Sequence, residues 1–474
     1  MVIVNVLKQG LLYSVFFVAT SLLATSRVCA SQPPVVSPPV LSIAEGSNPN
    51  IVLIMADDLG AESVGCYGST VFSTPNLDRM ARRGARFENA YGTPSCSPSR
   101  AMIMTGQYLN RTGFLERLKT GAGTGLPAHV KTFGHFFQQN GYETGIAGKW
   151  HLGDFEDFPD HPAANGFDTY YMYGGYIREE SYGYGPPIWE NGTFTVLDKS
   201  VYGPDLYCDS ILTFIEENRD RPFLAYYPMT LVHKPFIAPP MIDDQIKHFF
   251  PESASADEKH YALMVSYMDR LVGRVLDKLD ELGLAENTLV IFTADNGTPN
   301  AITSHIGDLA IKGGKLALIE SGYRIPMIAT WPGTIPVGTR DSFMTLTDVY
   351  PTLAGLTGHT VDHEVDGMDL SHTFLDQPGT DREYVYMAWE GDRYFVRDKR
   401  FRLHQDGRLY DIPVSSNETR YSEKHATNPE HADARKRLEG KLAEFKKIKK
   451  SDDSYTLAIL KTNKKLNTAE EMGR

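Results

Sequence analysis

The chain repeats one pattern: a short apolar run ends in charged or turn-forming residues, and a longer amphipathic stretch follows. The first run, residues 50–56, has no polar alternation, which is typical of a parallel strand covered on both faces. Similar runs lie at 143–147, 223–227, 288–294 and 327–331. The amphipathic stretches between them are at 80–85, 130–140, 206–218 and 259–282. This alternation predicts an α/β domain with a large mixed, mostly parallel central sheet flanked by helices.

The pattern changes after about residue 380. Four short runs predict antiparallel strands at 384–388, 394–398, 401–404 and 407–411, and a helix is predicted at 432–445. We therefore expect a smaller C-terminal α+β subdomain. The expected boundaries are a main domain over 49–380, the subdomain over 381–445 and a charged tail over 446–474.

The N-terminus has the layout of a secretory signal peptide. Lys8 precedes an apolar stretch at 11–24, and Val28-Cys29-Ala30 precedes Ser31, which matches the n-region, h-region and small-residue cleavage site. A membrane anchor is the alternative, but the run is short and interrupted by Ser and Thr. We predict a signal peptide at 1–30, a Pro- and Ser-rich linker at 31–48, and an exported, periplasmic or secreted protein with no membrane span after cleavage.

The overall charge restricts the class of ligand. The 474 residues include 47 Lys and Arg against 59 Asp and Glu, giving a formal net charge of −12. A protein with this balance lacks the basic face that nucleic-acid binding needs. An anionic substrate would have to be held by local cations.

Ionisable residues follow four of the predicted strands. In open α/β sheets, ligands bind beyond the carboxyl ends of the strands, so these residues are expected to meet at one edge. The oxygens of the acidic and amide side chains suit Ca²⁺ or Mg²⁺, although each pair alone could be a turn or a helix cap. The residues are Asp57 and Asp58, Lys149 and His151, His233, and Asp295 and Asn296.

A short helix is predicted to begin near Cys96. Ser97 is the expected N-cap and Pro98 the expected first helical residue. Arg100 is four residues after Cys96, so both can face the same side. A buried structural cysteine in a capped helix is the alternative interpretation.

The longer string from Cys96 to Tyr108, with Pro98, Arg100 and Thr105-Gly106, resembles the signature of the formylglycine-dependent (type I) sulfatases, in the alkaline phosphatase superfamily. Gly148 to Gly153 is similar to the family's second signature. The resemblance covers nearly all of residues 48–445 and includes His233-Lys234-Pro235 and Gly313-Gly314-Lys315, followed by the stretch 320–326.

The resemblance implies a modified nucleophile and a metal. A formylglycine-generating maturation enzyme would be a transient partner that oxidises Cys96. The oxidised side chain would then coordinate one Ca²⁺, with Mg²⁺ as the other candidate, together with Asp57, Asp58, Asp295 and Asn296.

The resemblance also implies roles for the remaining charged residues. Arg100 would stabilise the nucleophile, and Lys149 and Lys315 would neutralise the sulfuryl oxygens. His233, with His151 as the alternative, would protonate the leaving alcohol, and His151 would accept the proton that allows sulfate to leave. Lys149, Lys315 and His233 would therefore also bind substrate.

The substrate class is inferred from residues 170–189, where six tyrosines and Trp189 lie among glycines. Such aromatic rings could stack on sugars, and Arg178 could bind a second anionic group; packing of the loop is the alternative. We expect a sulfated oligo- or polysaccharide as substrate. The competing functions are a phosphonate monoester or phosphodiester hydrolase of the same superfamily and a non-catalytic binder of sulfated glycans.

Overall fold

The structure is a computed structural model. It describes residues 48–115, 117–118, 125–127, 129–175, 179–240, 254–390, 393–412, 421, 424–426 and 428–448, all within one compact unit of the chain. The predicted signal peptide, most of the predicted linker and tail, and Arg178 lie outside the described residues.

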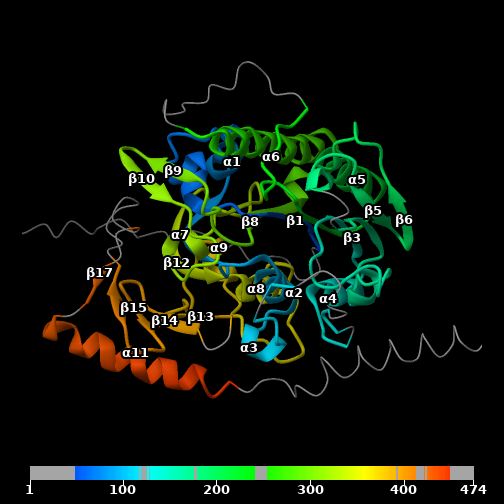
Figure 1. Cartoon of the computed structure of the whole chain (residues 1–474). Helices are drawn as coiled ribbons and strands as arrows, with labels where there is room; N and C mark the ends of the chain where they lie inside the picture. Colours follow the sequence, from blue (N-terminus) through cyan, green and yellow to red (C-terminus); the bar gives the residue numbers. More distant parts are fainter. Residues whose placement is uncertain are drawn as a thin grey trace, which may run out of the picture. The chain divides into compact units, whose positions relative to one another are not determined.

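A ten-stranded sheet forms the centre of the main domain (Figure 1). Strands β8, β1, β7, β3 and β4 are neighbours and run parallel, which confirms the predicted α/β class. Strand β11 is antiparallel to both of its neighbours. The order across the sheet is β12 (Gly338–Thr345), β2 (Ala85–Tyr91), β11 (Met327–Thr330), β8 (Thr288–Ala294), β1 (Asn50–Ala56), β7 (Phe223–Pro228), β3 (Glu143–Gly148), β4 (Thr169–Tyr173), β5 (Pro187–Glu190) and β6 (Thr193–Val196).

The centre of this sheet positions the candidate site. All seven residues of β1 are buried, as expected for an apolar strand between two parallel neighbours. Ala56 at the end of β1 is paired with Ala294 at the end of β8, and Met55 with Pro228 at the end of β7. The chain segments that follow these three strands therefore leave the sheet side by side.

Helices cover both faces of the sheet. Figure 1 shows α1 (Pro75–Arg82), α5 (Gly203–Glu217) and α6 (Ala256–Glu281) on one side. On the other side lie α2 (Cys96–Thr105), α4 (Phe133–Gln139) and α8 (Leu346–Leu356). Shorter elements are α3 (Leu109–Thr112), α7 (Glu320–Tyr323), α9 (Ser371–Phe374) and the hairpin β9 (Thr303–Ile306) and β10 (Leu309–Lys312).

The long helix α6 begins where its sequence provides a capping box. The side chain of Ser255 accepts a hydrogen bond from the backbone N–H of Glu258, whose carboxylate in turn accepts one from the Ser255 N–H. Two backbone donors that the helix leaves unpaired are satisfied in this way. Among the described residues, no helix combines the length and the apolar character needed to cross a membrane.

The C-terminal residues form a second, antiparallel sheet with one helix, as predicted. Its strands are β13 (Val385–Trp389), β14 (Arg393–Arg397), β15 (Phe401–His404), β16 (Leu409–Asp411) and β17 (Lys424–His425). Helix α11 (Ala432–Phe445) packs Leu438 and Leu442 against Val396 and Leu403 of the sheet.

Several local predictions were wrong or incomplete. The helix expected at 80–85 begins at Pro75 and ends at Arg82, because Ala85 already belongs to β2. Strand β2 contains polar residues that conceal its pattern; one of them, Asn89, is buried and donates to the backbone oxygen of Asp341. Strands β4, β5, β6 and β12 were also not predicted.

Candidate active site

The four predicted strand ends meet at one edge of the sheet. They belong to β8, β1, β7 and β3, which are consecutive neighbours. Helix α2 and the loop after β10 add Cys96, Arg100 and Lys315 to the same cluster. Every site residue predicted from the sequence lies in this cluster except Arg178, which is outside the described residues.

The start of α2 differs from the prediction. The helix begins at Cys96, and its N-cap is the extended residue Ser95. Ser97 cannot serve as the cap, because it already lies within the helix, where its Oγ accepts a hydrogen bond from the N–H of Leu118 at 3.0 Å. Cys96 is thereby the first residue of the helix.

The Cys96 thiol is surrounded by charged groups. Its Sγ lies 3.6 Å from Asp57 Oδ1, 3.9 Å from Asp58 Oδ1 and 3.7 Å from Lys315 Nζ. Burial raises the pKa of Cys96 to about 12. Because the thiolate is the reactive form of cysteine, the unmodified side chain would be a poor nucleophile at neutral pH.

Arg100 joins three elements at the base of the site. Its Nε and Nη2 donate to Asp295 Oδ2 at 3.1 and 2.8 Å, and its Nη1 donates to the backbone oxygen of Lys149 at 2.9 Å. The guanidinium is 1% exposed. It therefore fixes the ends of β8 and β3 relative to α2.

Asp57 is approached by several donors. Its Oδ2 accepts from Lys149 Nζ and from the hydroxyl of Tyr182, both at 2.6 Å. Burial alone would raise the pKa of Asp57, but the cations Lys149, Arg100 and Lys315 together hold it well below the usual value. The carboxylate is therefore ionised.

Asp58 is the second acidic centre. Lys315 Nζ contacts both of its carboxylate oxygens, at 2.5 and 2.6 Å. Asn296 Nδ2 donates to Oδ1 at 2.8 Å, and His233 Nε2 lies 3.8 Å from Oδ2. The backbone N–H of Asp58 donates to Asp295 Oδ1 at 3.1 Å, so the Asp295 carboxylate is held at the Asp58 backbone.

The cluster fits a divalent cation. Ligand atoms of Asp57, Asp58, Cys96 and His233 all lie within 4.8 Å of one another. Asn296 Oδ1 is buried without a hydrogen-bond partner, which leaves an amide oxygen for coordination. Burial and the neighbouring Asp57 raise the pKa of Asp295 to about 6, and a cation would relieve this repulsion. An oxygen-rich set of this kind suits Ca²⁺ or Mg²⁺.

Backbone strain is concentrated around the cluster. Asp58, His151 and Leu316, the residue after Lys315, have φ values of 65°, 56° and 68°. Non-glycine residues in this left-handed region cost about 1–3 kcal/mol each and occur often at functional sites. Gly148 also has a positive φ, and a Cβ there would lie 2.0 Å from the Pro228 oxygen, which explains a glycine immediately before Lys149.

Two tyrosines contribute in ways that the sequence did not reveal. Tyr182 contacts Asp57, as described, and the hydroxyl of Tyr261 donates to the Asp58 backbone oxygen at 3.0 Å. Both tyrosines are far from their partners in the sequence, so no local pattern could show these contacts.

Tyr170 and Tyr173 are 4% and 7% exposed and belong to β4, so the idea that they stack on sugars is wrong.

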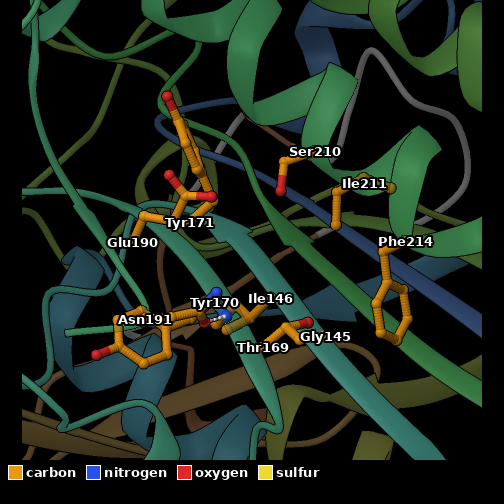
Figure 2. Close-up of a pocket in the computed structure, with 10 residues that line it drawn as sticks. All are labelled: Gly145, Ile146, Thr169, Tyr170, Tyr171, Glu190, Asn191, Ser210, Ile211 and Phe214. Atoms are coloured by element: carbon orange, nitrogen blue, oxygen red, sulfur yellow. Dashed lines mark hydrogen bonds between the residues drawn. The ribbon is translucent and has the colours of Figure 1, made fainter. Parts of the chain in front are cut away.

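A separate cavity of about 50 Å³ lies between α5 and strands β3 and β4 (Figure 2). Its volume is enough for a few water molecules at most. Its lining, which includes Tyr171, Glu190 and Ser210, contains none of the residues of the charged cluster. This cavity therefore does not compete with the cluster as the reaction site.

Comparison with known proteins places the chain in one family. The Sulfatase family model matches residues 49–359, and the chain belongs to the formylglycine-dependent sulfatases of the alkaline phosphatase superfamily. It is a sulfuric ester hydrolase.

Individual relatives agree with this assignment. Arylsulfatase G of Rattus norvegicus is 30% identical over 386 residues, covering 71% of each chain. N-acetylgalactosamine-6-sulfatase of Canis lupus familiaris is 32% identical over 381 residues, covering 73% of this chain and 69% of its own. The crystal structure of Ps i-CgsB in complex with k-i-k-neocarrahexaose has a TM-score of 0.73 and 28% identity, covering 89% of this chain and 98% of that one.

Proposed function

We propose that this sulfatase hydrolyses sulfate esters of carbohydrates with a formylglycine formed from Cys96 and one bound Ca²⁺. The observation that carries the proposal is the position of Cys96 Sγ, within 3.6–3.9 Å of Asp57, Asp58 and Lys315. The similarity to Ps i-CgsB, whose crystal structure contains a neocarrahexaose, and to N-acetylgalactosamine-6-sulfatase supports a carbohydrate substrate.

The metal would be held by oxygen ligands from two strand ends and from position 96. Asp57, Asp58, Asp295 and Asn296 would bind it, and the unpartnered Asn296 Oδ1 supports this set. Bound Ca²⁺ supplies positive charge that favours ionisation of a nearby hydroxyl. Arg100, hydrogen-bonded to Asp295, would keep the carboxylates in place and stabilise the same anion.

The oxidised side chain accounts for turnover. As its hydrate, a formylglycine at position 96 supplies one hydroxyl that attacks sulfur and a second that allows sulfate to be expelled with return of the aldehyde. A cysteine or serine has no second hydroxyl. The raised pKa of the Cys96 thiol is consistent with a need for this modification.

The two lysines would bind the sulfuryl group. Lys149 Nζ contacts Asp57 and Lys315 Nζ contacts Asp58, so the two ammonium groups lie at two carboxylates of the same cluster. Cations fixed around the transferring group stabilise the charge that its oxygens carry in the transition state. In the complex, each lysine would contact the sulfuryl group as well as its carboxylate, and the metal would bind the same carboxylates.

The two histidines would move protons. His233 Nε2 faces Asp58 Oδ2 at 3.8 Å, and it would protonate the oxygen of the leaving alcohol. His151 Nδ1 is buried and has no hydrogen-bond partner among the described groups. Burial and the neighbouring Lys149 hold the pKa of His151 well below its usual value, so the ring is neutral and can accept the proton released when sulfate leaves.

The boundaries and location predicted from the sequence belong to the same proposal. The mature protein would begin after residue 30, and export would place it where sulfated polysaccharides occur. Arg178 would contact a second anionic group of the substrate, and the maturation enzyme would act on Cys96 before folding.

The proposal is tested by sulfate release. The purified protein is incubated with sulfated oligosaccharides, an aryl sulfate, a phosphodiester and a phosphonate monoester, with and without Ca²⁺. We expect the highest kcat/KM on a sulfated oligosaccharide and none above background for Cys96→Ala. Cys208→Ala, which removes another buried free thiol, is the matched control and should remain active.

The same assay separates the alternatives. Preference for the phosphodiester or phosphonate would support the rival hydrolase. Binding of sulfated oligosaccharide without release of sulfate would support the non-catalytic binder. That class is disfavoured because Cys96, Arg100 and all four proposed metal ligands are present.

A further inference from the structure

Tyr182 lies against the cluster although it belongs to none of the strand ends. It ends the short 3₁₀ helix Glu179–Tyr182, in the connection between β4 and β5. The residue is 4% exposed. A tyrosine buried this deeply normally places its hydroxyl on a specific partner.

The hydroxyl of Tyr182 fixes the orientation of Asp57. It donates to Asp57 Oδ2 at 2.6 Å, and Lys149 Nζ contacts the same oxygen at 2.6 Å. With Oδ2 held by two donors, Oδ1 is the oxygen that faces Cys96 Sγ, at 3.6 Å. The carboxylate thus keeps one oxygen directed toward the proposed metal and nucleophile.

The ring of Tyr182 contacts the proposed general acid. It stacks on the His233 imidazole with ring centroids 4.7 Å apart and an angle of 28° between the planes. Lys149 Nζ lies 5.6 Å from the centroid of the same ring. One side chain therefore contacts a proposed metal ligand, the proposed acid and a proposed sulfate-binding lysine.

We infer that Tyr182 is a positioning residue with two separable tasks: its hydroxyl orients Asp57 for the metal, and its ring orients His233 toward the leaving group. The inference rests on the proposed function. Hydrogen-bond partners of metal ligands typically change metal affinity about 10- to 100-fold when they are removed. Loss of ring stacking affects the acid instead of the metal.

Two variants separate the tasks. Tyr182→Phe removes only the hydroxyl, and Tyr182→Leu removes the hydroxyl and the ring. The matched control is Tyr170→Phe, because Tyr170 also donates to a carboxylate, Asp160 Oδ1 at 2.8 Å, but lies outside the cluster. The full-length, matured protein is used throughout.

The first measurement is Ca²⁺ affinity by isothermal titration calorimetry. We expect Tyr182→Phe to bind Ca²⁺ about 10- to 100-fold more weakly than wild type, while Tyr170→Phe binds it normally. At saturating Ca²⁺ the Tyr182→Phe variant should regain most of its kcat. A Ca²⁺ affinity of Tyr182→Phe equal to that of wild type would overturn the role of the hydroxyl.

The second measurement compares leaving groups at saturating Ca²⁺. An aryl sulfate with an acidic phenol needs little protonation, whereas a sugar alcohol needs a general acid. We expect Tyr182→Leu to lose at least about tenfold more kcat on a sulfated oligosaccharide than on the aryl sulfate. Tyr182→Phe should keep most of its kcat on both substrates. Equal losses in Tyr182→Leu on both substrates would overturn the role of the ring.

The two proposals fail differently. If wild type showed no Ca²⁺ binding, the proposed metal and the role of the hydroxyl would both be contradicted. If wild type bound Ca²⁺ and hydrolysed sulfate esters, but the Tyr182 variants matched Tyr170→Phe in both measurements, only the role of Tyr182 would be overturned.

Discussion

The protein buries charged side chains in two regions, and the two arrangements differ. Between the main domain and the C-terminal residues, two buried arginines each pair with one carboxylate: Arg382 contacts Asp348, and Arg397 contacts Glu320. At the edge of the central sheet, Asp57 alone is approached by Lys149, Arg100 and two further donors.

The difference shows what each region is built for. In the first region each of these carboxylates is paired with one buried arginine, and pairing of buried charges is what structural stability requires. At the sheet edge, Asp57 faces two cations, Lys149 and Arg100, Asn296 Oδ1 has no partner, and Asp58 and His151 have strained backbones. Such a region fits the proposed metal ion and sulfuryl group, and we infer that its residues serve function more than stability.

The largest effect is expected from Lys315→Ala. Loss of one preorganised cation at the transferring group should lower kcat/KM by about 10²–10³-fold, measured by sulfate release at saturating Ca²⁺. The unfolding midpoint of the Ca²⁺-bound protein should change little, because the proposed metal would compensate the charge of Asp58. Activity within a factor of a few of wild type would contradict the functional assignment of this region.

The converse is expected for Arg382→Met. This variant keeps the aliphatic stem but leaves Asp348, which is fully buried, without its cation. Removing one partner of a buried pair costs about 3–5 kcal/mol, so the free energy of unfolding in urea should fall by that amount. The kcat of the folded protein should stay near that of wild type. A loss of kcat without a loss of stability would contradict the structural role assigned to Arg382.

Much of the fold was predictable because a strand that is buried on both faces has a continuous apolar run in the sequence. Strand β8 was predicted with its observed bounds, and helix α11 likewise. Strand β2 was missed because its polar residues are satisfied by distant partners such as Asp341. The antiparallel direction of β11 also depends on neighbours that no local pattern reveals.

The site was predictable where residues directly follow strands. Asp57, Lys149 and Asp295 converge because parallel strands end at one edge. The contact between Tyr182 and Asp57 was not predictable, because it depends on the path of a long connection. The N-cap assigned to Ser97 was wrong, because the helix already begins at Cys96 and Ser95 is its N-cap.

At acidic pH, protonation of His161 should weaken the hydrogen bonds that hold Trp150 in place near the edge of the sheet. Its Nδ1 accepts from Trp150 Nε1 at 2.8 Å and its Nε2 donates to the Leu126 oxygen at 2.7 Å, which holds the segment between Lys149 and His151. Burial lowers the pKa of His161 from 6.5 to about 4, so the unfolded chain takes up a proton at higher pH than the folded one.

His161 therefore contributes fully to stability above about pH 6.5, and this contribution falls as the pH drops from 6.5 to about 4. The shift corresponds to roughly 3 kcal/mol. Urea unfolding between pH 7.5 and 4 should show His161→Gln losing less stability toward acid than wild type. Identical pH slopes would contradict a neutral, buried His161.

The smallest effect is expected at an exposed ion pair. Arg79 and Asp277 are 2.8 Å apart, with side chains 29% and 66% exposed. Pairs of this kind contribute about 0–1 kcal/mol, so Arg79→Ala should change the free energy of unfolding by less than 1 kcal/mol and leave kcat unchanged. A loss as large as that of Arg382→Met would show that burial does not separate the structural pairs from the surface ones.

The central claim is that Cys96 is the precursor of the nucleophile. Its most direct test is mass analysis of the peptide that contains Cys96, taken from protein made in its native host and assayed for sulfate release. The account predicts an aldehyde at position 96, with specific activity proportional to the oxidised fraction across preparations. Full activity in protein that carries only the thiol at Cys96 would contradict it.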